Sequence, residues 1–424
     1  MCRLGSPRQR ESGVVLILAV FAVALLAVLA VGITAAVRVE LLASRTGLDR
    51  TQGLFLAEAG LARARALLMY DDPAVDTLTD AWGPLAEEPI DLPQPLGDGF
   101  YRVRVTDACG RIDINEANYQ MLMRLTDDAD VTAAILDWRD KGSGVTVEGA
   151  EAEYYSALPL PYLPRDGEFQ TPGELLLVRG VTPALYFGTE ERPGLRDLVT
   201  VSSYSANTDP EGNPKLNLNE FRNWSEPAFR EQIMNKLGSL FVMYSPTEGF
   251  DQIFKGLVYL TDDGQPGYTA LAQLRTAAGL DFGTIANLVD YVTVDEGDVA
   301  RGKVNLNTAP LEVMAVLPGS SEAVASEIVA RREQQPFTSL GEIVTLLTQL
   351  SDGPMVFQQM IDHVTTKSSS FLIESMGWTE VGHAHRTLSA LVQRQPDVVL
   401  TVRQGESDFP LPAPTEEPVL VARR

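Results

Sequence analysis

The stretch from Val14 to Val37, VVLILAVFAVALLAVLAVGITAAV, contains 24 residues and no charged side chain. About 20 apolar residues in a helix span the hydrocarbon core of a bilayer, so this stretch predicts a transmembrane helix over residues 14–37. It is too long for the apolar region of a secretory signal peptide, and no small-residue cleavage site follows it. Helical spacing instead continues to about residue 70, which predicts an extension of the helix beyond the membrane over residues 38–70.

The residues before this helix, 1–13 (MCRLGSPRQRESG), set its expected orientation. They contain Arg3, Arg8 and Arg10 against a single acidic residue, Glu11. Because basic residues accumulate on the cytoplasmic side, we expect a cytoplasmic N-terminus and a body in a periplasm or its equivalent. The net charge is −23 for the chain and +2 for these residues, which leaves −25 for the remainder. Such an acidic body is a poor partner for nucleic-acid phosphates or anionic lipid.

The body changes its patterning three times along the chain. Residues 71–110 begin as an Asp- and Pro-rich loop and then alternate as a strand near 100–106. Residues 111–365 have helical patterning, and residues 366–404 alternate or carry β-branched residues typical of strands. The Pro- and Glu-rich segment 405–424 is expected to be a flexible tail. This order predicts an α+β fold with a helical region inserted between the strands of one sheet.

A five-residue pattern occurs three times in the helical region: RIDIN at 111–115, KLNLN at 215–219 and KVNLN at 303–307. Each copy reads basic, apolar, Asn or Asp, apolar, Asn, and helical patterning follows it. We expect the apolar pair to fill a core and the final Asn to cap the next helix. The three copies therefore predict three helical modules.

The last of these modules has the pattern of a helix–hairpin–helix motif. Its helical segments 311–317 and 322–332 flank a tight turn at Pro318 and Gly319, and a third segment begins at 337–343. The first module repeats the pattern more loosely, with segments at 117–125, 131–140 and 169–175 and an insertion over 141–168. The middle region, 215–300, is helical by pattern but less clear.

Four acidic residues of the first module are candidate Ca²⁺ ligands: Asp137, Asp140, Glu151 and Glu153. Ca²⁺ takes six to eight oxygen ligands in flexible geometry, which suits carboxylates that converge from a helix end and a loop. The alternative is ordinary surface charge at a helix C-terminus. The sequence has no Ser–His–Asp arrangement, no paired-Cys metal site and no phosphate-binding Gly loop, so we expect no enzyme activity.

The N-terminus resembles a prepilin-type signal, in which a membrane peptidase cuts after a glycine and leaves the apolar helix in the mature chain. The resemblance implies cleavage after Gly13 by the prepilin peptidase and methylation of the new N-terminus at Val14. Most pilins and pseudopilins carry Glu at the fifth mature position, which here is Leu18. One subfamily typically lacks this Glu, the minor pseudopilin K of type II secretion.

Further motifs resemble that same K subfamily. They are D-W-x-D at 137–140, G-A-E at 149–151, E-L-x-x-V-x-G at 174–180, N-x-N-T-A-P at 305–310 and L-P-G at 317–319. The resemblance implies a transmembrane pilin helix packed on a small antiparallel sheet, with a large inserted α-helical domain of helix–hairpin–helix (SAM-like) modules. The implied boundaries are a leader at 1–13, the membrane span at 14–37, its periplasmic extension at 38–70, an α/β domain at 71–110 and 366–404, the inserted domain at 111–365 and a tail at 405–424. Calcium sites are known in this family.

The resemblance also implies a function and partners. Such a protein would sit in the inner membrane with a single span, and then cap the tip of a periplasmic pseudopilus and help to start its assembly. The implied partners are the I- and J-type minor pseudopilins, the major pseudopilin, the prepilin peptidase and the inner-membrane secretion platform. A buried carboxylate among apolar helices is costly unless it is paired. A subunit with Leu18 offers no carboxylate to a subunit above it, which suits a position at the tip.

Two alternatives stay open. One is a minor pilin of a related type IV pilus, and the other is a membrane-anchored DNA receptor of competence type, whose helix–hairpin–helix motif is similar. In that motif, backbone N–H groups at the hairpin contact a phosphate. Here the turn at Pro318 and Gly319 lacks a second glycine and a following Lys, and Glu322 would repel phosphate. We therefore expect a packing and protein-interaction role for the motif, and no nucleic-acid binding.

Overall fold

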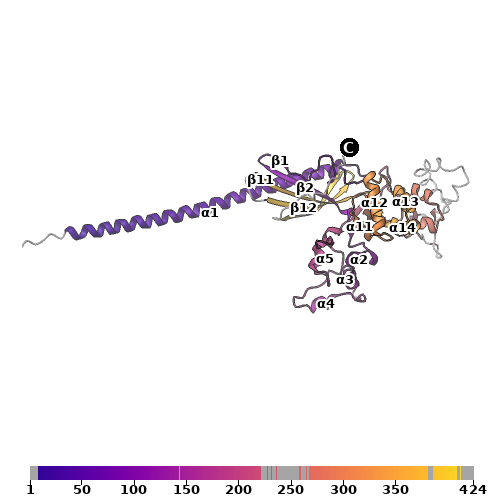
Figure 1. Cartoon of the computed structure of the whole chain (residues 1–424), viewed down its shortest axis with the longest axis horizontal. Coiled ribbons are helices and arrows are strands. Elements are labelled where there is room, and N and C mark those ends of the chain that lie inside the picture. Colours follow the sequence, from indigo (N-terminus) through magenta and orange to yellow (C-terminus); the bar gives the residue numbers. More distant parts are fainter. Residues whose placement is uncertain are drawn as a thin grey trace, which may run out of the picture.

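The structure is a computed structural model that describes residues 8–142, 144–220, 267–380 and 385–407, together with positions 227, 231, 235, 257, 258, 264 and 411. A long helix, α1 (Arg8–Tyr70), extends from the body as a rod (Figure 1). A sheet lies against the far half of α1, helices α11–α14 lie beyond the sheet, and α2–α5 form a separate lobe (Figure 1).

Helix α1 has two different halves. Among the described residues it is the one helix long and apolar enough to cross a membrane, and side chains from Val14 to Leu42 are exposed. Further along, Ala57, Leu61, Ala64 and Leu68 are buried at the spacing of one helix face. The helix runs without a break to Tyr70, as the spacing predicted.

The sheet is antiparallel throughout. Its five strands are β1 (Gln94–Leu96), β2 (Gly99–Asp107), β11 (Ser370–Thr379), β12 (His385–Gln395) and β13 (Val398–Ser407), in the order β1-β2-β11-β12-β13. In its centre Ile373 of β11 lies opposite Val105 of β2 and Ala390 of β12, and these apolar residues form a core with α1. A side chain at Gly377 would overlap the α1 backbone at Gly53, so this glycine lets helix and sheet approach closely.

The helical region lies between β2 and β11, so the predicted interrupted sheet is confirmed. Strand β13 continues to Ser407, three residues past the expected boundary at 404. The rest of the expected tail lies outside the described residues, apart from Leu411.

Each of the three modules is closed by a two-residue parallel ladder that joins its first and last strands. The ladders pair β3 (Ile112–Asp113) with β4 (Val199–Thr200), β6 (Leu216–Asn217) with β7 (Val292–Thr293), and β9 (Val304–Asn305) with β10 (Val364–Thr365). We call the enclosed segments module 1 (112–200), module 2 (216–293) and module 3 (304–365). One further pair, β5 (Tyr204–Ala206) with β8 (Val299–Arg301), connects their flanks.

The modules contain short helices around one continuous apolar core. Module 1 has α2 (Tyr119–Thr126), α3 (Ala129–Arg139), α4 (Ala152–Ser156), the 3₁₀ helix η2 (Pro172–Leu177), α5 (Pro183–Phe187) and α6 (Leu195–Leu198). Module 2 has α9 (Gln273–Thr276) and α10 (Phe282–Leu288), and much of its expected helical segment lies outside the described residues. Module 3 has α11 (Leu311–Val316), α12 (Glu322–Gln334) and α13 (Leu340–Gln349), which confirm its three predicted helical segments. It also has α14 (Gly353–Met360), which the sequence did not predict.

The expectation that the final Asn of each repeat caps the next helix was wrong. Asn307 instead holds the backbone of Phe337: its amide donates to the Phe337 carbonyl at 2.9 Å and accepts from the Phe337 N–H at 2.8 Å. Asn115 holds Phe169 and Asn219 holds Tyr268 in the same way. Helix α2 is capped by Asn118. The final Asn of each repeat therefore binds the backbone of an aromatic residue far along the chain. We call this pair of hydrogen bonds the clamp.

A buried polar group joins the sheet to module 3. The carboxylate of Asp107, at the end of β2, accepts hydrogen bonds from Thr308 and Ser368 at 2.6 Å each and from the Asn305 amide at 3.1 Å. Burial raises the pKa of Asp107, while these donors oppose the rise. Because a buried carboxylate is stable only when it is well hydrogen-bonded, this contact fixes module 3 against the sheet.

Candidate functional site

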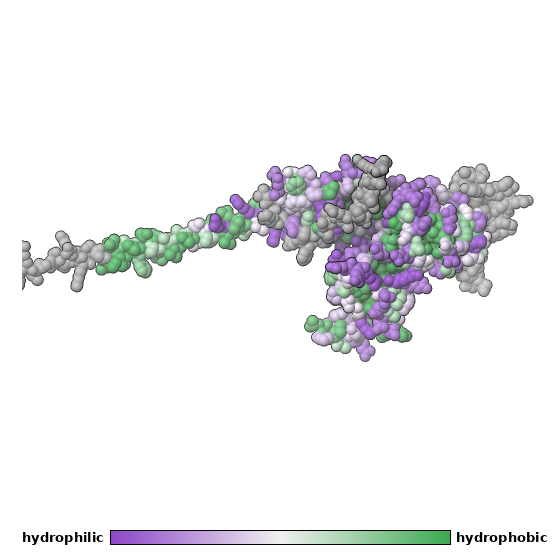
Figure 2. All heavy atoms as spheres, in the orientation of Figure 1, coloured by the Kyte–Doolittle hydropathy of each residue, from purple (hydrophilic) through white to green (hydrophobic). Residues whose placement is uncertain are grey.

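The expected processing residues lie near the beginning of α1. The helix includes Gly13 and Val14, and Leu18 follows one turn later with 64% of its surface exposed. Figure 2 shows this part of the rod as almost uniformly hydrophobic. Leu18, the fifth residue after Gly13, is thus an apolar side chain in an exposed part of α1.

Three of the four candidate Ca²⁺ ligands converge in module 1. Asp137 lies in the last turn of α3, Asp140 is the C-cap residue of that helix, and Glu151 is the N-cap residue of α4. One carboxylate oxygen from each lies within 4.8 Å of the others. Glu153 is exposed on α4 and is not part of this group. We call Asp137, Asp140 and Glu151 the acidic cluster.

The surrounding loop holds two of these carboxylates by backbone N–H groups. Thr146 donates to both carboxylate oxygens of Asp137 at 3.2 Å, and Gly142 donates to Asp140 at 2.7 Å. A side chain at Gly149 would overlap the Asp137 carboxylate. The G-A-E motif therefore provides both the space and the third carboxylate.

Glu151 lacks compensation for its burial. It is only 6% exposed, and its Oε1 atom has no hydrogen-bond partner in the described structure. Burial raises the pKa of Glu151, and the charges of Asp137 and Asp140 raise it further. Three converging carboxylates with an unsatisfied buried oxygen fit a hard divalent cation such as Ca²⁺.

The hairpin of module 3 is covered. Gly319 has a left-handed backbone (φ +74°), and a side chain there would lie 3.3 Å from Val356 of α14. From module 1, Arg124 donates to the carbonyls of Ala315, Leu317 and Ser320 at 2.8–3.1 Å. The turn at Pro318 and Gly319 is thus filled by contacts with α14 and module 1, which supports the packing role inferred from its acidic sequence.

An exposed apolar patch lies at the tip of the lobe formed by module 1 (Figure 2). It includes Val147, Leu160 and Leu163, which are 71–85% exposed. These residues belong to the insertion over 141–168, beside the acidic cluster. The insertion was visible in the sequence as an interruption of the repeat, but the sequence did not show that its apolar residues are exposed.

Comparisons with known proteins agree with the motifs. The family model of type II secretion system protein K matches residues 113–190, and a helix–hairpin–helix model matches residues 299–365. The type II secretion system protein K of Pectobacterium carotovorum subsp. carotovorum is 26% identical over 202 residues, which cover 42% of this chain and 61% of the relative. That of Klebsiella pneumoniae is 27% identical over 201 residues, which cover 42% of this chain and 60% of the relative.

Among solved structures, the crystal structure of the GspK-GspI-GspJ complex from the enterotoxigenic Escherichia coli type 2 secretion system contains a similar chain. It is 13% identical with a TM-score of 0.46, over 86% of this chain and 99% of that chain. The matched part of this chain spans about 60% of the length of the curated relatives. These sequence matches are to type II secretion system protein K, the family that the motifs at 137–140, 149–151, 174–180 and 305–310 resemble.

Proposed function

We propose that this protein is a minor pseudopilin that caps the tip of a periplasmic type II pseudopilus and helps to start its assembly, so that folded proteins can cross the outer membrane. The observation that carries the proposal is the combination of a bare apolar helix with a wide helical body inserted between β2 and β11 (Figure 1). In a filament, the rod formed by α1 would pack against the rods of neighbouring subunits. The wide body would prevent a further subunit from stacking above it.

The proposed partners follow from the similarity to type II secretion system protein K. The I- and J-type minor pseudopilins would pack beside the rod, and the major pseudopilin would lie below. Leu18 favours the uppermost position, since it offers no carboxylate to the N-terminal amine of a further subunit. The chain would first sit in the inner membrane with its N-terminus cytoplasmic, where the prepilin peptidase cuts after Gly13.

Mass spectrometry of the mature protein tests the processing. We expect a chain that starts at N-methylated Val14, and an intact Met1 or a cut beyond Val37 would exclude the pilin pathway. A Gly13→Leu variant is expected to keep its leader, while Gly32→Ala, in an open part of the helix, should be processed normally.

Co-purification tests the position. The full chain in detergent should form a ternary complex with its I- and J-type neighbours, and Leu18→Glu should leave that complex intact but allow the chain to enter the shaft. Failure of the complex with correctly folded partners would exclude the tip assignment. Binding of the full chain to duplex DNA at low salt would favour the competence-type alternative.

We also propose that the acidic cluster binds Ca²⁺ through Asp137, Asp140 and Glu151. The unsatisfied oxygen and the raised pKa of Glu151 support this role. A ligand at a hundred times its Kd stabilises a protein by about 2.7 kcal/mol. Ca²⁺ should therefore raise the Tm of the full chain relative to EDTA, and Glu151→Gln should remove this effect.

The matched control for that experiment is Glu153→Gln, two residues away on the same helix but outside the cluster. It should keep the Ca²⁺ effect in full. In EDTA, Glu151→Gln should be more stable than the wild type, because it removes one of three repelling charges. An equal Ca²⁺ response in both variants would exclude the cluster as the site.

A further inference from the structure

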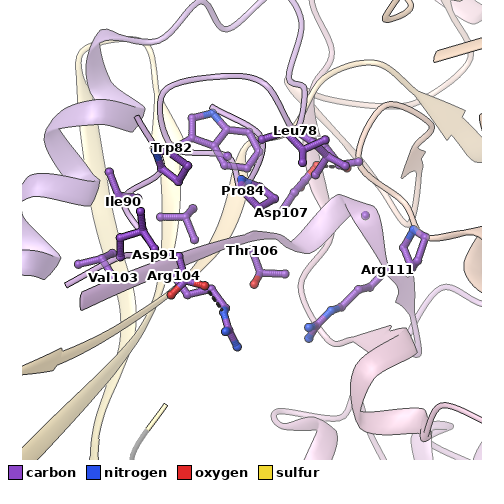
Figure 3. A pocket seen from close by; sticks show the side chains of 18 of the residues that line it. Leu78, Trp82, Pro84, Ile90, Asp91, Val103, Arg104, Thr106, Asp107 and Arg111 are labelled. Carbon is purple, nitrogen blue, oxygen red and sulfur yellow. Dashed lines mark hydrogen bonds and ion pairs between the residues drawn. The ribbon is translucent and has the colours of Figure 1, made fainter. Parts of the chain in front are cut away.

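A groove of about 840 Å³ lies where the sheet meets modules 1 and 3 (Figure 3). Its walls are formed by the loop 78–92, the second half of β2, Gly110 and Arg111 just before module 1, Asp197 near the end of that module, and the beginning of module 3. Most of the wall is apolar, with Leu78, Trp82, Pro84, Ile90, Leu92 and Pro310. Nothing in the secretion function described above uses this groove.

One side of the groove is an open strand edge. Strand β1 pairs with β2 only as far as Tyr101, and beyond it the Val103 N–H donates to the Ile90 carbonyl at 3.3 Å. In an antiparallel strand, alternate residues direct both backbone groups to the same side. The N–H and C=O of Val105 therefore point into the groove as well, and no described residue pairs with them there. Such an edge can accept an added strand.

The groove also holds a cation without an ion-pair partner. Arg111 lines the groove, and within the described ranges its guanidinium group has no hydrogen bond and no ion pair. Burial lowers the pKa of Arg111. The guanidinium groups of Arg104 and Arg111 lie on the same side of β2 (Figure 3). A half-buried cation without an ion-pair partner favours an acidic ligand, so Arg111 is the residue that such a ligand would bind.

The acidic groups that face Arg111 have other bonds. Asp91 is shared by Arg102 at 2.5 Å and Arg104 at 3.1 Å, and Asp197 lies 3.3 Å from the Arg196 guanidinium. Asp107 is held by its three side-chain donors, and Glu374 faces Arg104 across the sheet. The negative charges of these carboxylates partly offset the positive charge of Arg111, but none of them forms an ion pair with it.

One described residue shows where a ligand could come from. Leu411 is 6% exposed, and its N–H donates to the Met376 sulfur at 3.4 Å. Met376 belongs to β11, opposite Arg102 of β2, on the face that points away from α1. Leu411 therefore lies at β11, the strand next to β2.

The sequence after Leu411 has the chemistry that the groove requires. It reads PAPTEEPVLVARR over 412–424, with Glu416 and Glu417 followed by the apolar run 419–421. Five extended residues carry Glu416 up to about 17 Å from Leu411. Strand β2 is one strand spacing of about 5 Å away from Met376, and Arg104 lies about 7 Å further along β2. Arg104 is therefore within reach, and Arg111 lies on the same side of β2 (Figure 3).

We propose that the groove is the docking site for residues 412–424 of this same chain. Glu416 and Glu417 bind Arg111 and its neighbour Arg104, and the apolar run packs against the wall around Trp82, beside the open edge at Val105. The docked segment fastens the sheet to modules 1 and 3 from outside, opposite the buried contact at Asp107.

The test uses the full chain in detergent and a fluorescein-labelled synthetic peptide of residues 412–424. By fluorescence anisotropy, the peptide should bind a variant that lacks 412–424 at least tenfold more tightly than it binds the full chain, whose groove is filled. A peptide with Glu416→Gln and Glu417→Gln should bind at least tenfold more weakly, and this comparison leaves the protein unchanged.

Two protein variants sharpen the result. Arg111→Met in the shortened chain should weaken peptide binding at least tenfold. In the full chain, Glu416→Gln with Glu417→Gln should open the groove to the peptide, whereas the exposed pair Glu190→Gln with Glu191→Gln, in a similar T-E-E sequence, should not. No binding to the shortened chain, or equal binding to both chains, would overturn the proposal. A full chain that is dimeric only when it carries 412–424 would overturn it too, since the segment would then dock on a second copy.

Discussion

Modules 1 and 3 begin with the same repeat and use it in the same way, yet they end in different roles. Both use a two-residue parallel ladder and an Asn clamp on an aromatic residue. Module 3 has its hairpin covered by α14 and by Arg124, whereas module 1 carries the insertion, the exposed apolar patch and the acidic cluster. The repeat is therefore a scaffold, and its loops decide whether a module packs or is available for contacts.

The residue three positions after the clamped aromatic residue explains why modules 2 and 3 pair with each other. Asp362, at the end of module 3, accepts from the Leu271 N–H of module 2 at 2.6 Å, and Asp290, at the end of module 2, accepts from the Leu340 N–H of module 3 at 2.9 Å. Both N–H groups lie three residues after the clamped aromatic. Module 1 has Pro172 at this position, and proline has no N–H to donate.

The clamp should show the largest difference between modules. Asn307→Ala leaves the buried N–H and C=O of Phe337 without partners, at a cost of roughly 4 kcal/mol of unfolding free energy. Asn115→Ala should cost about half as much, roughly 2 kcal/mol, because the Asn115 clamp is only partly buried. Urea unfolding of the full chain measures both values. If both variants lost the same unfolding free energy, the different burial of the two clamps would not affect their strength.

The third residue of the repeat gives the next largest effect. It is Asn in modules 2 and 3 but Asp113 in module 1, where burial raises the pKa of the carboxyl group to about 6 from 3.8. A carboxyl group whose pKa rises on folding contributes its full stability below pH 3.8 and loses it as the pH rises through about 6. We expect the wild type to lose about 3 kcal/mol from this group between pH 4 and 7.

Asp113→Asn should remove that loss, so the difference in unfolding free energy between variant and wild type should change with pH over this window. Asn305→Asp should introduce a similar loss into module 3. A difference that stays constant from pH 4 to 7 would show that Asp113 keeps an ordinary pKa in the folded chain.

The reciprocal caps come next. Asp362→Asn weakens a charge-assisted hydrogen bond to the N-terminus of α9, so we expect a loss of about 1 kcal/mol. The matching change in module 1, Asp197→Asn, should have an effect within about 0.5 kcal/mol, because Asp197 is a half-exposed partner of Arg196. Thermal unfolding of the two variants side by side compares them, and a larger loss for Asp197→Asn would refute the assigned asymmetry.

The smallest effect concerns the position that separates module 1 from the others. Pro172→Ala restores an N–H but gives up the restricted backbone at the start of η2, where Thr171 and Glu174 form a capping box. We expect a loss of about 0.5 kcal/mol in urea unfolding. A gain in stability would indicate that module 1 can form a cap like the one Asp362 provides.

The sequence predicted the local features of this fold well. The apolar run, the alternating strands and the Pro318–Gly319 hairpin each depend on residues close together in the chain, and all are present. The three repeats were recognised, but the partner of their final Asn was not. Asn115 binds Phe169, 54 residues away, and Asn307 binds Phe337, 30 residues away. Such pairings depend on how the module closes, which no local pattern specifies.

The acidic cluster shows the same limit. The D-W-x-D and G-A-E motifs contain Asp137, Asp140 and Glu151, and the three carboxylates converge because a helix end and a short loop keep them together. Glu153 follows Glu151 by two residues, which on a helix directs it to a different face. The groove was missed entirely, because β2, the loop 78–92 and the two modules meet only in the folded chain.

The bare part of α1 has a mechanical consequence. The helix first meets the sheet at Asp49, whose carboxylate accepts a hydrogen bond from Thr379 of β11, so residues 38–48 stand between the predicted membrane span at 14–37 and the body. At 1.5 Å per residue this stalk is about 16 Å long, which leaves clearance for neighbouring helices beneath the body. The stalk also acts as a lever arm: a tilt of about 20°, typical of membrane helices, would swing its far end sideways by about 6 Å. Small changes at the base of the rod would thus become large changes in where the body points.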